Sequence, residues 1–390
     1  MAKKPNIRFA GFEDDWEQRK LGELGEILTG STPSTSNSAY YSEDGIPWVT
    51  PTDINELTIS DTPRKLSEEG AKVGRVVPAN TILCTCIASI GKNTLLTVKG
   101  SFNQQINSLT PYDENDAYFL LTDSEIWSNT MKRMAASGTM QIVNKTEFSE
   151  LKTMVPSLVE QQAIGTYFHT LDHLITLHQR KCDELKKVKK FMLQKMFPKK
   201  GEKNPEIRFD GFTNDWEQRK LGDVVEFLDT MRKPLEGAKR ISGPYPYYGA
   251  SGIVDYVDGY LFDEELVLLS EDGANITDRN YPVCFLASGK YWVNNHAHVL
   301  KTKDGNENNF ICNSLERKDY KQYNSGMAMP KLNQEVCRGI PISCPSFDEQ
   351  KKIGDYFSNL DHLITLHQRK CEELKNVKKY MLQNMFAKGE

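Results

Sequence analysis

The sequence lacks long apolar runs and an excess of charge of either sign. None of its 390 residues lies in a stretch approaching the roughly 18 uninterrupted apolar residues that a membrane-spanning helix needs, and the start, MAKKPNIRFAGFEDDW, has no apolar signal-peptide core. We therefore expect a cytoplasmic protein without a membrane partner. The 49 Lys and Arg against 53 Asp and Glu give a net charge of −4, so the overall charge does not indicate a nucleic-acid partner.

The eight cysteines include no Cys-x-x-Cys pair. They are scattered through a long chain without an export signal, which indicates reduced thiols and not a disulfide framework. Cys84 and Cys86 lie two residues apart in the apolar run ANTILCTCIASI. We expect them to be buried structural thiols, because apolar surroundings raise the pKa of a thiol and suppress its reactivity.

Signatures of catalysis are also missing. There is no Gly-x-Gly-x-x-Gly cofactor loop, no Asp/Asn-Pro-Pro-aromatic tetrapeptide of amino-methyltransferases, no Gly-x-Ser-x-Gly elbow and no His-Glu-x-x-His helix. The segment 25–32, GEILTGST, has the glycine spacing of a phosphate loop but lacks the lysine that reaches the phosphates. We therefore expect a protein that is not an enzyme, binds no cofactor directly and has no catalytic residues.

What the sequence does have is an internal duplication. Residues 7–23, IRFAGFEDDWEQRKLGE, recur at 207–223 with four differences, an offset of 200. A second block, which starts at 156, recurs from 345 at an offset of 189, and its run LDHLITLHQRKC is identical in both copies. Between the blocks similarity largely disappears. The segment that joins the two halves, FPKKGEKNPEIRF, resembles the end of the chain (FAKGE) followed by its beginning (KKPNIRF). This predicts a ring-like arrangement with neighbouring termini.

A heptad pattern runs through both copies of the second block. Its inward positions alternate steps of four and three residues, which is typical of a coiled-coil helix. These seam positions include Leu171, Ile175, His178 and Cys182 in the first copy and Leu360, Ile364, His367 and Cys371 in the second. A helix of ~38 residues is ~57 Å long and cannot bury such a stripe alone. We therefore expect the two helices to pair with each other in antiparallel orientation.

Two interpretations remain open for the seam histidines and cysteines. In the antiparallel register His178 lies near Cys371 and Cys182 near His367, and four such side chains could hold a zinc ion. We favour the other interpretation, in which they set the register of the seam and no metal binds. Lys189 and Lys378 are likewise expected to be register-setting or snorkelling residues and not catalytic lysines.

Each variable stretch between the repeated blocks mixes short β-like runs with Gly, Pro and Asn turns, which predicts β-rich α+β domains. Both stretches are also rich in side chains that can reach base edges or phosphates, since Asn and Gln pair with adenine and Lys with guanine. Our candidates are Lys92, Asn103, Gln104, Gln105 and Gln141 in the first stretch, and Tyr248, Ser251, Asn275, Asn294 and His296 in the second. The alternative for each is a turn-capping or surface role.

The motifs together resemble one family, the DNA-specificity subunits of type I restriction-modification systems. The resemblance spans about residues 7–388 and rests on the repeated DWEQRKLG, on IPWVTPTDI and FNQQI in the first variable region, on YPYYGASG and GYLFDEE in the second, and on the duplicated helix. It implies an α+β fold with two β-rich target-recognition domains joined by two long antiparallel coiled-coil helices. The implied division is 1–155 and 200–344 for the recognition domains, and 156–199 and 345–390 for the helices.

The resemblance also implies a function. The protein would read an asymmetric, bipartite double-stranded DNA target and recruit two modification subunits, which bind S-adenosylmethionine, and restriction subunits, which use ATP and Mg²⁺ to translocate DNA. The net charge divides into +8 on 172–199 with 361–388 and −12 elsewhere, which favours DNA binding shared with partners. The alternatives are a coiled-coil scaffold that reads no DNA and a stand-alone DNA-modifying enzyme.

Overall fold

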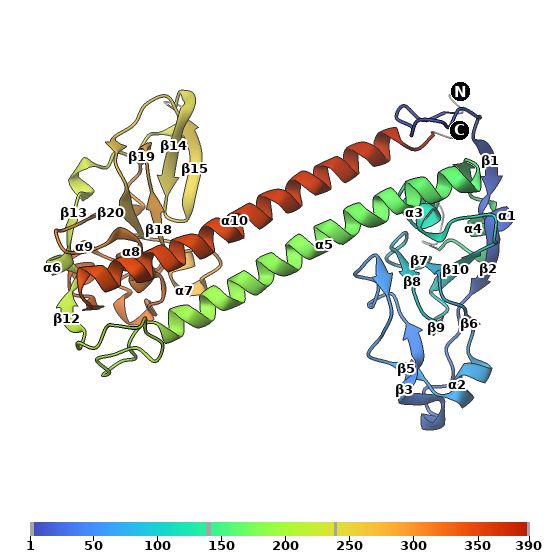
Figure 1. Ribbon diagram of the computed structural model, residues 1–390, viewed down its shortest axis with the longest axis horizontal. Coiled ribbons are helices and arrows are strands. Elements are labelled where there is room, and N and C mark those ends of the chain that lie inside the picture. The colour runs from blue at the N-terminus through green and yellow to red at the C-terminus, as the bar shows by residue number, and fades with distance from the viewer. Residues whose placement is uncertain (1–3, 138–141, 238–239, 388–390) are drawn as a thin grey trace. The chain divides into compact units, whose positions relative to one another are not determined.

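The computed structural model describes residues 4–137, 142–237 and 240–387, and these form two compact units (Figure 1). The first unit combines the chain up to His178 with the segment from Lys370 onward, and the second runs from Gln179 to Arg369. The first unit therefore combines two separate stretches of sequence, whereas the second is one continuous stretch. Each of the two long helices contributes one part to each unit.

The first unit contains two main sheets. The larger has the strand order β2 (Gly25–Thr29), β10 (Ile106–Pro111), β7 (Thr81–Thr85), β8 (Asn93–Leu96), β4 (Thr58–Ile59), and the smaller has the order β5 (Lys65–Leu66), β3 (Tyr41–Val49), β9 (Gly100–Phe102), β6 (Val76–Val77). A separate pair joins β1 (Glu17–Lys20) to β11 (Lys152–Val155). The helical elements are α1 (Leu21–Leu24), η1 (Ser38–Tyr40), α2 (Glu68–Val73), α3 (Ala117–Ser137) and α4 (Lys145–Glu150).

The second unit repeats this plan. One sheet has the order β13 (Val225–Phe227), β20 (Ala297–Thr302), β17 (Leu266–Ser270), β18 (Cys284–Ala287), and the other has β15 (Gly252–Val257), β14 (Ser242–Gly249), β19 (Lys290–Val293), β16 (Phe262–Asp263). The separate pair is β12 (Glu217–Lys220) with β21 (Pro341–Cys344). The helical elements are α6 (Leu221–Val224), η2 (Asp229–Met231), α7 (Asn275–Asp278), α8 (Asn308–Glu316), η4 (Lys321–Tyr323) and α9 (Gln334–Arg338).

The two variable regions share a topology that their sequences do not reveal. In the first unit β10 lies between β2 and β7, and in the second β20 lies between β13 and β17. The two units also share an equivalent parallel strand pair, β3 with β9 and β14 with β19, and the first unit has a second parallel pair, β4 with β8. The strands β7 and β17 are buried along their whole length, because both faces of these central strands are covered. The α+β fold with two β-rich domains is confirmed.

The long helices are α5 (Leu158–Lys195) and α10 (Phe347–Asn384), each of 38 residues. Pro156 and Pro198 flank α5, where the missing N–H and the ring of proline disfavour continuation. The heptad seam is confirmed by burial. Its buried members are Ile164, Phe168, Leu171, Cys182 and Leu185 in α5 and Ile353, Phe357, Leu360, Ile364 and Cys371 in α10, while Ile175, His178 and His367 are partly buried.

Ion pairs across the seam set its register. In the first unit the Lys378 ammonium lies 2.9 Å from the Asp172 carboxylate, and in the second unit Lys189 lies 2.6 Å from Asp361. These pairs correspond through the offset of 189, so the repeat uses the same contact twice. Within the first unit Cys371 contacts the carbonyl of Ile175, which together with the Asp172 pair shows that the helices run antiparallel there. The seam lysines thus have the expected register-setting role.

An aromatic cluster anchors the repeated N-terminal segment of each half to the helices. In the first unit the ring of Phe386, just after α10, lies 6.1 Å from Trp16, 5.4 Å from Phe119 and 5.8 Å from Phe168. The second unit contains the equivalent cluster of Phe197, Trp216, Phe310 and Phe357, with matching separations of 6.0, 5.4 and 6.1 Å. All eight rings are almost completely buried. The end of one long helix and the start of the other therefore share one core in each unit.

A buried ion pair reinforces this anchor. Arg8 donates two hydrogen bonds to Glu160, at 2.6 and 2.7 Å, and Arg208 donates two to Glu349, at 2.7 and 2.8 Å. Both glutamates are about 1% exposed. Such a two-point pair satisfies both charges at once, and removing one partner leaves the other charge buried without compensation.

The termini of the chain meet as the joint sequence predicts. The backbone N–H of Ile7 donates to the carbonyl of Asn384 at 2.9 Å. The corresponding bond in the second unit runs from Ile207 to Lys195, also at 2.9 Å, where the chain is continuous. The ring-like arrangement is therefore confirmed for the segment that begins at residue 4 and the segment that ends at residue 387.

All eight cysteines lie in the described residues, where they are buried and form no disulfide. Burial raises the pKa of Cys84 and Cys284 well above its usual value and that of Cys344 to about 11. The Cys84 thiol contacts the Met131 sulfur at 3.6 Å. The prediction of inert structural thiols at 84 and 86 agrees with this burial.

We predict that Phe386→Ala destabilises the first unit by about 3–5 kcal/mol, because it removes a ring from a closed core. The free energy of unfolding, measured by chemical denaturation of the full chain, checks this. Val377→Ala on the same helix is the matched control, since Val377 is 42% exposed and surface changes cost within ~0.5 kcal/mol. Equal losses for both variants would contradict the role of the aromatic cluster.

Candidate nucleic-acid interface

In the first unit, the loops that follow β2, β7 and β9 meet at one place. Ser31 N–H donates to the carbonyl of Phe102, and Cys86 N–H donates to the carbonyl of Gln105, at 2.9 and 2.8 Å. The Thr32 hydroxyl also donates to the Gln104 side chain. Three loops that are far apart in sequence thus present their side chains from one connected group, which we call the first loop group (30–32, 86–92 and 103–105).

The structure places four of the five candidate residues in this group. Gln104 and Lys92 are exposed, and Gln105 is partly buried. Asn103 is 8% exposed, and its side-chain oxygen accepts a hydrogen bond from the N–H of Gln105 at 3.0 Å. This bond makes Asn103 a cap of the turn, and its side-chain N–H also donates to the Gln105 side chain at 3.2 Å. Gln141 lies outside the described residues.

The second unit contains the corresponding loops around the end of β17. Ser270 Oγ donates to the carbonyl of Ala250, and Glu271 N–H donates to that of His296 at 2.9 Å. Gly273 N–H donates to the carbonyl of Pro330 at 3.0 Å. The second loop group therefore consists of 249–252, 270–276, 294–296 and 330–332.

All five candidates of the second region lie in or beside this group. Ser251 and His296 are exposed, and the His296 ring lies 2.9 Å from an oxygen of Asp272. The Asn275 side-chain N–H donates to the carbonyl of Tyr281, and its side-chain oxygen accepts from the N–H of Tyr281, so Asn275 shapes its own loop. Tyr248 is half-buried and stacks on Phe285, and burial raises its pKa. Asn294 is 7% exposed and bonds the N–H of His296.

The two loop groups correspond residue by residue in their backbone bonds. Asn103 N–H donates to the carbonyl of Val49, and Asn294 N–H donates to that of Tyr248. The same offset of 191 relates the two asparagine caps to each other and Gln105 to His296. One backbone frame thus carries a glutamine in the first unit and a histidine in the second. The frame is common to the two units, and the chemistry of its exposed side chains differs.

Two arginines beside these loops were missed in the sequence. The Arg64 guanidinium lies over the rings of Tyr41 and Trp48, at 5.6 and 5.7 Å, and that of Arg240 lies 4.6 Å from the Tyr247 ring. Trp48 and Tyr247 occupy the same place on the parallel strands β3 and β14. A signal was available, because IPWV and YPYY align as a Pro-aromatic pair. A guanidinium held flat on a ring is suited to stacking or to phosphate contact.

A buried ionic network supports the second loop group. Arg232 donates to Glu271 at 2.6 Å and lies 3.3 Å from Asp229, while Lys331 lies 3.4 Å from the other oxygen of Glu271. The ring of His298 contacts Asp229 at 2.6 Å and the carbonyl of Leu332 at 2.7 Å. Because Glu271 and Lys331 belong to the second loop group, the network holds the group to the sheet.

The charges in this network determine one another. Burial lowers the pKa of His298, but the hydrogen bond and the negative charge of Asp229 raise it by more, to about 10. Burial raises the pKa of Asp229, but His298 lowers it by more, so that the net shift is downward. The imidazole is therefore protonated at neutral pH and donates from both nitrogens.

Among the described residues, Asp229, Glu271 and His298 are the one group of three potential metal ligands. Both nitrogens of His298 are occupied by hydrogen bonds, and Arg232 bridges the two carboxylates. A metal ion needs a free imidazole lone pair, and the cationic arginine takes the place that it would occupy. The group acts as an ion-pair network and does not have the chemistry of a metal site.

The described helices include none that is long and apolar enough to cross a membrane.

Comparison with known proteins identifies what the chain is similar to. The family model for the type I restriction modification DNA specificity domain matches twice, over residues 13–187 and 213–376. The HindI specificity subunit of Haemophilus influenzae is 32% identical over 41% of this chain and 37% of its own length. The MjaIX specificity subunit of Methanocaldococcus jannaschii is 24% identical over 95% of this chain and 92% of its own length.

The fold is also that of a solved structure. The type I restriction-modification S subunit of M. genitalium aligns with a TM-score of 0.73 at 15% identity, covering 99% of this chain and 100% of the other. At this identity the likeness concerns the fold alone. The chain spans only 36% and 37% of the length of two H. influenzae relatives that it matches, whereas the match to the M. jannaschii protein covers 92% of that protein.

We predict that His298→Gln destabilises the folded protein at neutral pH, and that this destabilisation decreases as the pH rises. A histidine whose pKa is raised on folding stabilises fully below its unfolded value of ~6.5, and this contribution is lost as the pH approaches 10. The difference in free energy of unfolding between wild type and His298→Gln should therefore shrink between pH 6.5 and 9.5, by a few kcal/mol at ~1.4 kcal/mol per pKa unit. His296→Gln, at a half-exposed position, is the matched control, and a pH-independent difference for His298→Gln would disprove the ion pair.

Proposed function

The chain belongs to the family of type I restriction-modification DNA specificity proteins, and we propose that it supplies the DNA-sequence recognition of such a complex without catalysing a reaction itself. Each of its two variable regions carries one match to the family's specificity domain. The observation that carries the proposal is the pair of loop groups, which share one backbone frame and present different side chains. Two such frames with unequal chemistry are what the reading of two different half-sites requires.

Within each loop group the residues divide by role. Asn103 and Asn294 cap their turns, and Asn275 shapes its loop, so they act through the backbone. The exposed or partly exposed side chains of Lys92, Gln104 and Gln105, and of Ser251 and His296, are those we assign to base or phosphate contact. Tyr248 supports Asn294 from the neighbouring strand, and Gln141 remains a candidate from its sequence position.

The long helices supply the spacing between the half-sites. Both helices continue from one unit into the other, and 38 residues at ~1.5 Å each amount to ~57 Å. A turn of B-DNA is ~34 Å, so such helices correspond to between one and two turns. We therefore assign to the protein an asymmetric bipartite target with an unread gap.

The partners follow from the same assignment. Double-stranded DNA is the ligand, two modification subunits provide methylation with S-adenosylmethionine, and restriction subunits use ATP and Mg²⁺. These cofactors belong to the partner subunits, and the place of the complex is the cytoplasm, where the DNA is. A coiled-coil scaffold without DNA readout would not need two loop frames of different chemistry, and a stand-alone enzyme would need a catalytic constellation on this chain.

We predict that His296→Ala changes recognition in one half-site only, and that Gln105→Ala changes the other. These residues occupy equivalent positions, so each variant is the control for its counterpart. Methylome sequencing of cells with and without the gene gives the motif, and the loss of a base contact should relax one position by about 1–3 kcal/mol, which is about 5- to 150-fold in preference. No methylated motif that depends on the gene would refute the proposed function.

We predict that seven residues inserted after Gln179 in α5 and after Gln368 in α10 lengthen the unread gap. One heptad preserves the seam and adds ~10.5 Å, or about three base pairs. Methylome sequencing measures the gap directly. The control inserts the heptad in α5 alone, which mismatches the seam and should abolish methylation, whereas an unchanged gap in the double insertion would disprove the spacing role.

A further inference from the structure

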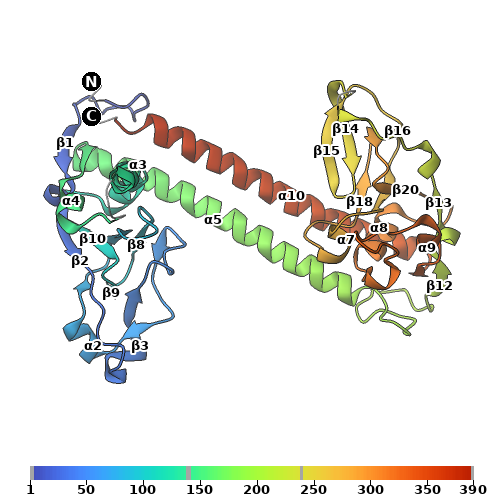
Figure 2. The same ribbon diagram turned by 180° about the vertical axis from the view of Figure 1, so that it is seen from behind.

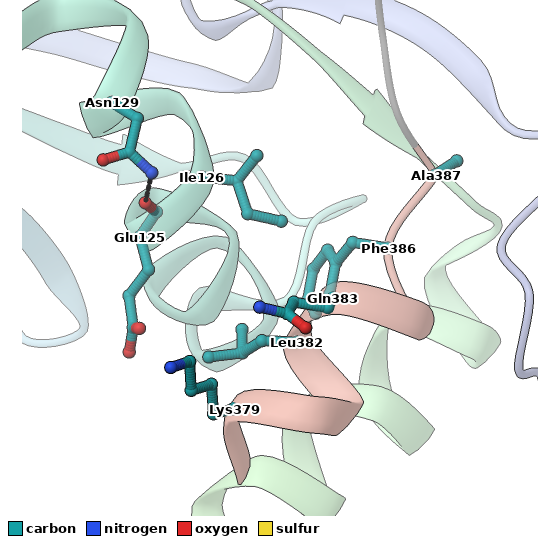
Figure 3. A pocket seen from close by; sticks show the side chains of 8 residues that line it. All are labelled: Glu125, Ile126, Asn129, Lys379, Leu382, Gln383, Phe386 and Ala387. Atoms are coloured by element: carbon teal, nitrogen blue, oxygen red, sulfur yellow. Dashed lines mark hydrogen bonds between the residues drawn. The ribbon is translucent and has the colours of Figure 1, made fainter. Parts of the chain in front are cut away.

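The first unit has a pocket whose equivalent place in the second unit is filled by a side chain. It lies between α3 and the end of α10, is open to solvent and has a volume of about 330 Å³. Figure 3 shows Glu125 and Ile126 of α3 on one side of the pocket, and Leu382 of α10 and Phe386, which follows α10, on the other. Its other lining residues are Asn129, Lys379, Gln383 and Ala387. Figure 2 shows these two helices from the reverse side.

The internal repeat identifies the equivalent place in the second unit. Through the offset of 189, Leu382, Phe386 and Ala387 correspond to Leu193, Phe197 and Pro198 at the end of α5. Helices α3 and α8 correspond through their caps, because Asp116 N–H donates to Gln161 and Glu307 N–H donates to Gln350, at 3.0 and 3.1 Å.

These caps set an offset of 191 between α3 and α8. Phe119 and Phe310 are related by the same offset, and each ring stacks at 5.4 Å on the phenylalanine that follows a long helix, Phe386 or Phe197. The same offset pairs Ile126 with Arg317.

Arg317 fills the equivalent place with its guanidinium. Its Nε donates to the carbonyl of Leu193 at 3.1 Å, its Nη2 donates to that of Pro198 at 3.5 Å, and the group lies 5.3 Å from the Phe197 ring centre. Carbonyls at the end of a helix carry partial negative charge, and an aromatic face attracts a cation. The second unit thus shows which chemistry this surface selects.

The first unit presents the same acceptors without such a cation. Ile126 is too short to reach the helix end, and among the described residues no side chain donates to the carbonyl of Leu382 or Ala387. Ile126 is 38% exposed, although it lies beside an almost fully buried Phe386. Lys379 in the wall corresponds to Lys190 of the second unit, so a lysine at this position is compatible with a bound guanidinium.

We propose that this pocket receives the guanidinium of an arginine from a partner protein, which takes the place that Arg317 takes in the second unit. The bound group would donate to the carbonyls of Leu382 and Ala387 and lie on the Phe386 ring. The Glu125 carboxylate at the wall accepts a hydrogen bond from Lys378 at 2.9 Å and has a second oxygen. A protein source suits a surface site of this kind, because arginine is enriched at the centres of interfaces and often dominates their affinity. The identity of the partner as a subunit of the complex rests on the proposed function.

The chemistry of the pocket is tested on the full chain with methylguanidinium. Nuclear magnetic resonance of isoleucine and leucine methyl groups should show saturable shifts of Ile126 and Leu382 with a millimolar dissociation constant and one site, and Leu382 reports the site in the Ile126 variants. Ile126→Arg should abolish the site, Arg317→Ile should create a second one reported by its own new methyl group, and Ile126→Leu is the matched control that keeps one site. The neutral analogue methylurea should not saturate.

Several results would overturn the proposal. They are the absence of a saturable shift in wild type, an unchanged saturable shift of Leu382 in Ile126→Arg, and equal binding of methylurea. Ile126→Arg replaces a partly exposed side chain, so this arm remains decisive even if Arg317→Ile fails to fold. Binding that occurs only after removal of residues 388–390 would show that the chain's own C-terminus occupies the pocket, which also contradicts a partner arginine.

The source of the arginine is tested by assembly with the modification subunit. Ile126→Arg should weaken association by about tenfold or more, whereas Ile126→Leu should leave it unchanged. The remaining complex should methylate the wild-type motif, because the loop groups are untouched. Wild-type association of Ile126→Arg would refute the docking of an arginine and leave the proposed function intact, whereas the absence of any motif with the wild-type chain would refute the proposed function instead.

Discussion

The seam between α5 and α10 is the constraint on which the rest of the structure depends. Neither helix can bury its apolar stripe alone, and each unit is completed by a part of both. Because of this pairing, Phe386 near the end of the chain packs into the same core as Trp16 near its beginning. The pairs of Asp172 with Lys378 and of Asp361 with Lys189 then choose one antiparallel register among those that the apolar stripes allow. The first unit therefore joins the beginning of the chain to its end, whereas the second unit is one continuous stretch from Gln179 to Arg369.

Duplication separates what must be constant from what can vary. The aromatic clusters, the Arg–Glu pairs and the asparagine caps occur twice with nearly the same geometry. The exposed side chains on the loops follow no such rule. The second loop group is braced by the ionic network around His298, whereas Thr29 and Asn107, at the positions in the first unit that correspond to Asp229 and His298, form an uncharged hydrogen bond at 2.7 Å. A specificity protein gains from this division, because loops can change their ligands while the cores that position them stay the same.

The repeat also makes one unit a reference for the other. Where an equivalent position differs, as Ile126 differs from Arg317, the contacts made in the second unit show what the surface of the first can bind. The same comparison revises the candidate residues. Asn103 and Asn294 attract notice in the sequence as polar side chains able to pair with adenine, yet both are buried and cap their turns. The polar composition directed attention to these loops, but composition cannot distinguish an amide that caps the turn from one that faces outward.

The sequence by itself determined the duplication, the heptad seam, the family and the proximity of the termini, because these depend on repetition and on a period of 3.5 residues, which are visible in one dimension. Only the tertiary structure decided that two dissimilar variable regions share one topology, that Arg64 and Arg240 lie beside the loops, and that Arg317 occupies a place left open in the first unit. These features depend on strand pairings and ring contacts between residues far apart in the chain. Such pairings are set by the closing of a common core, and no local pattern encodes them.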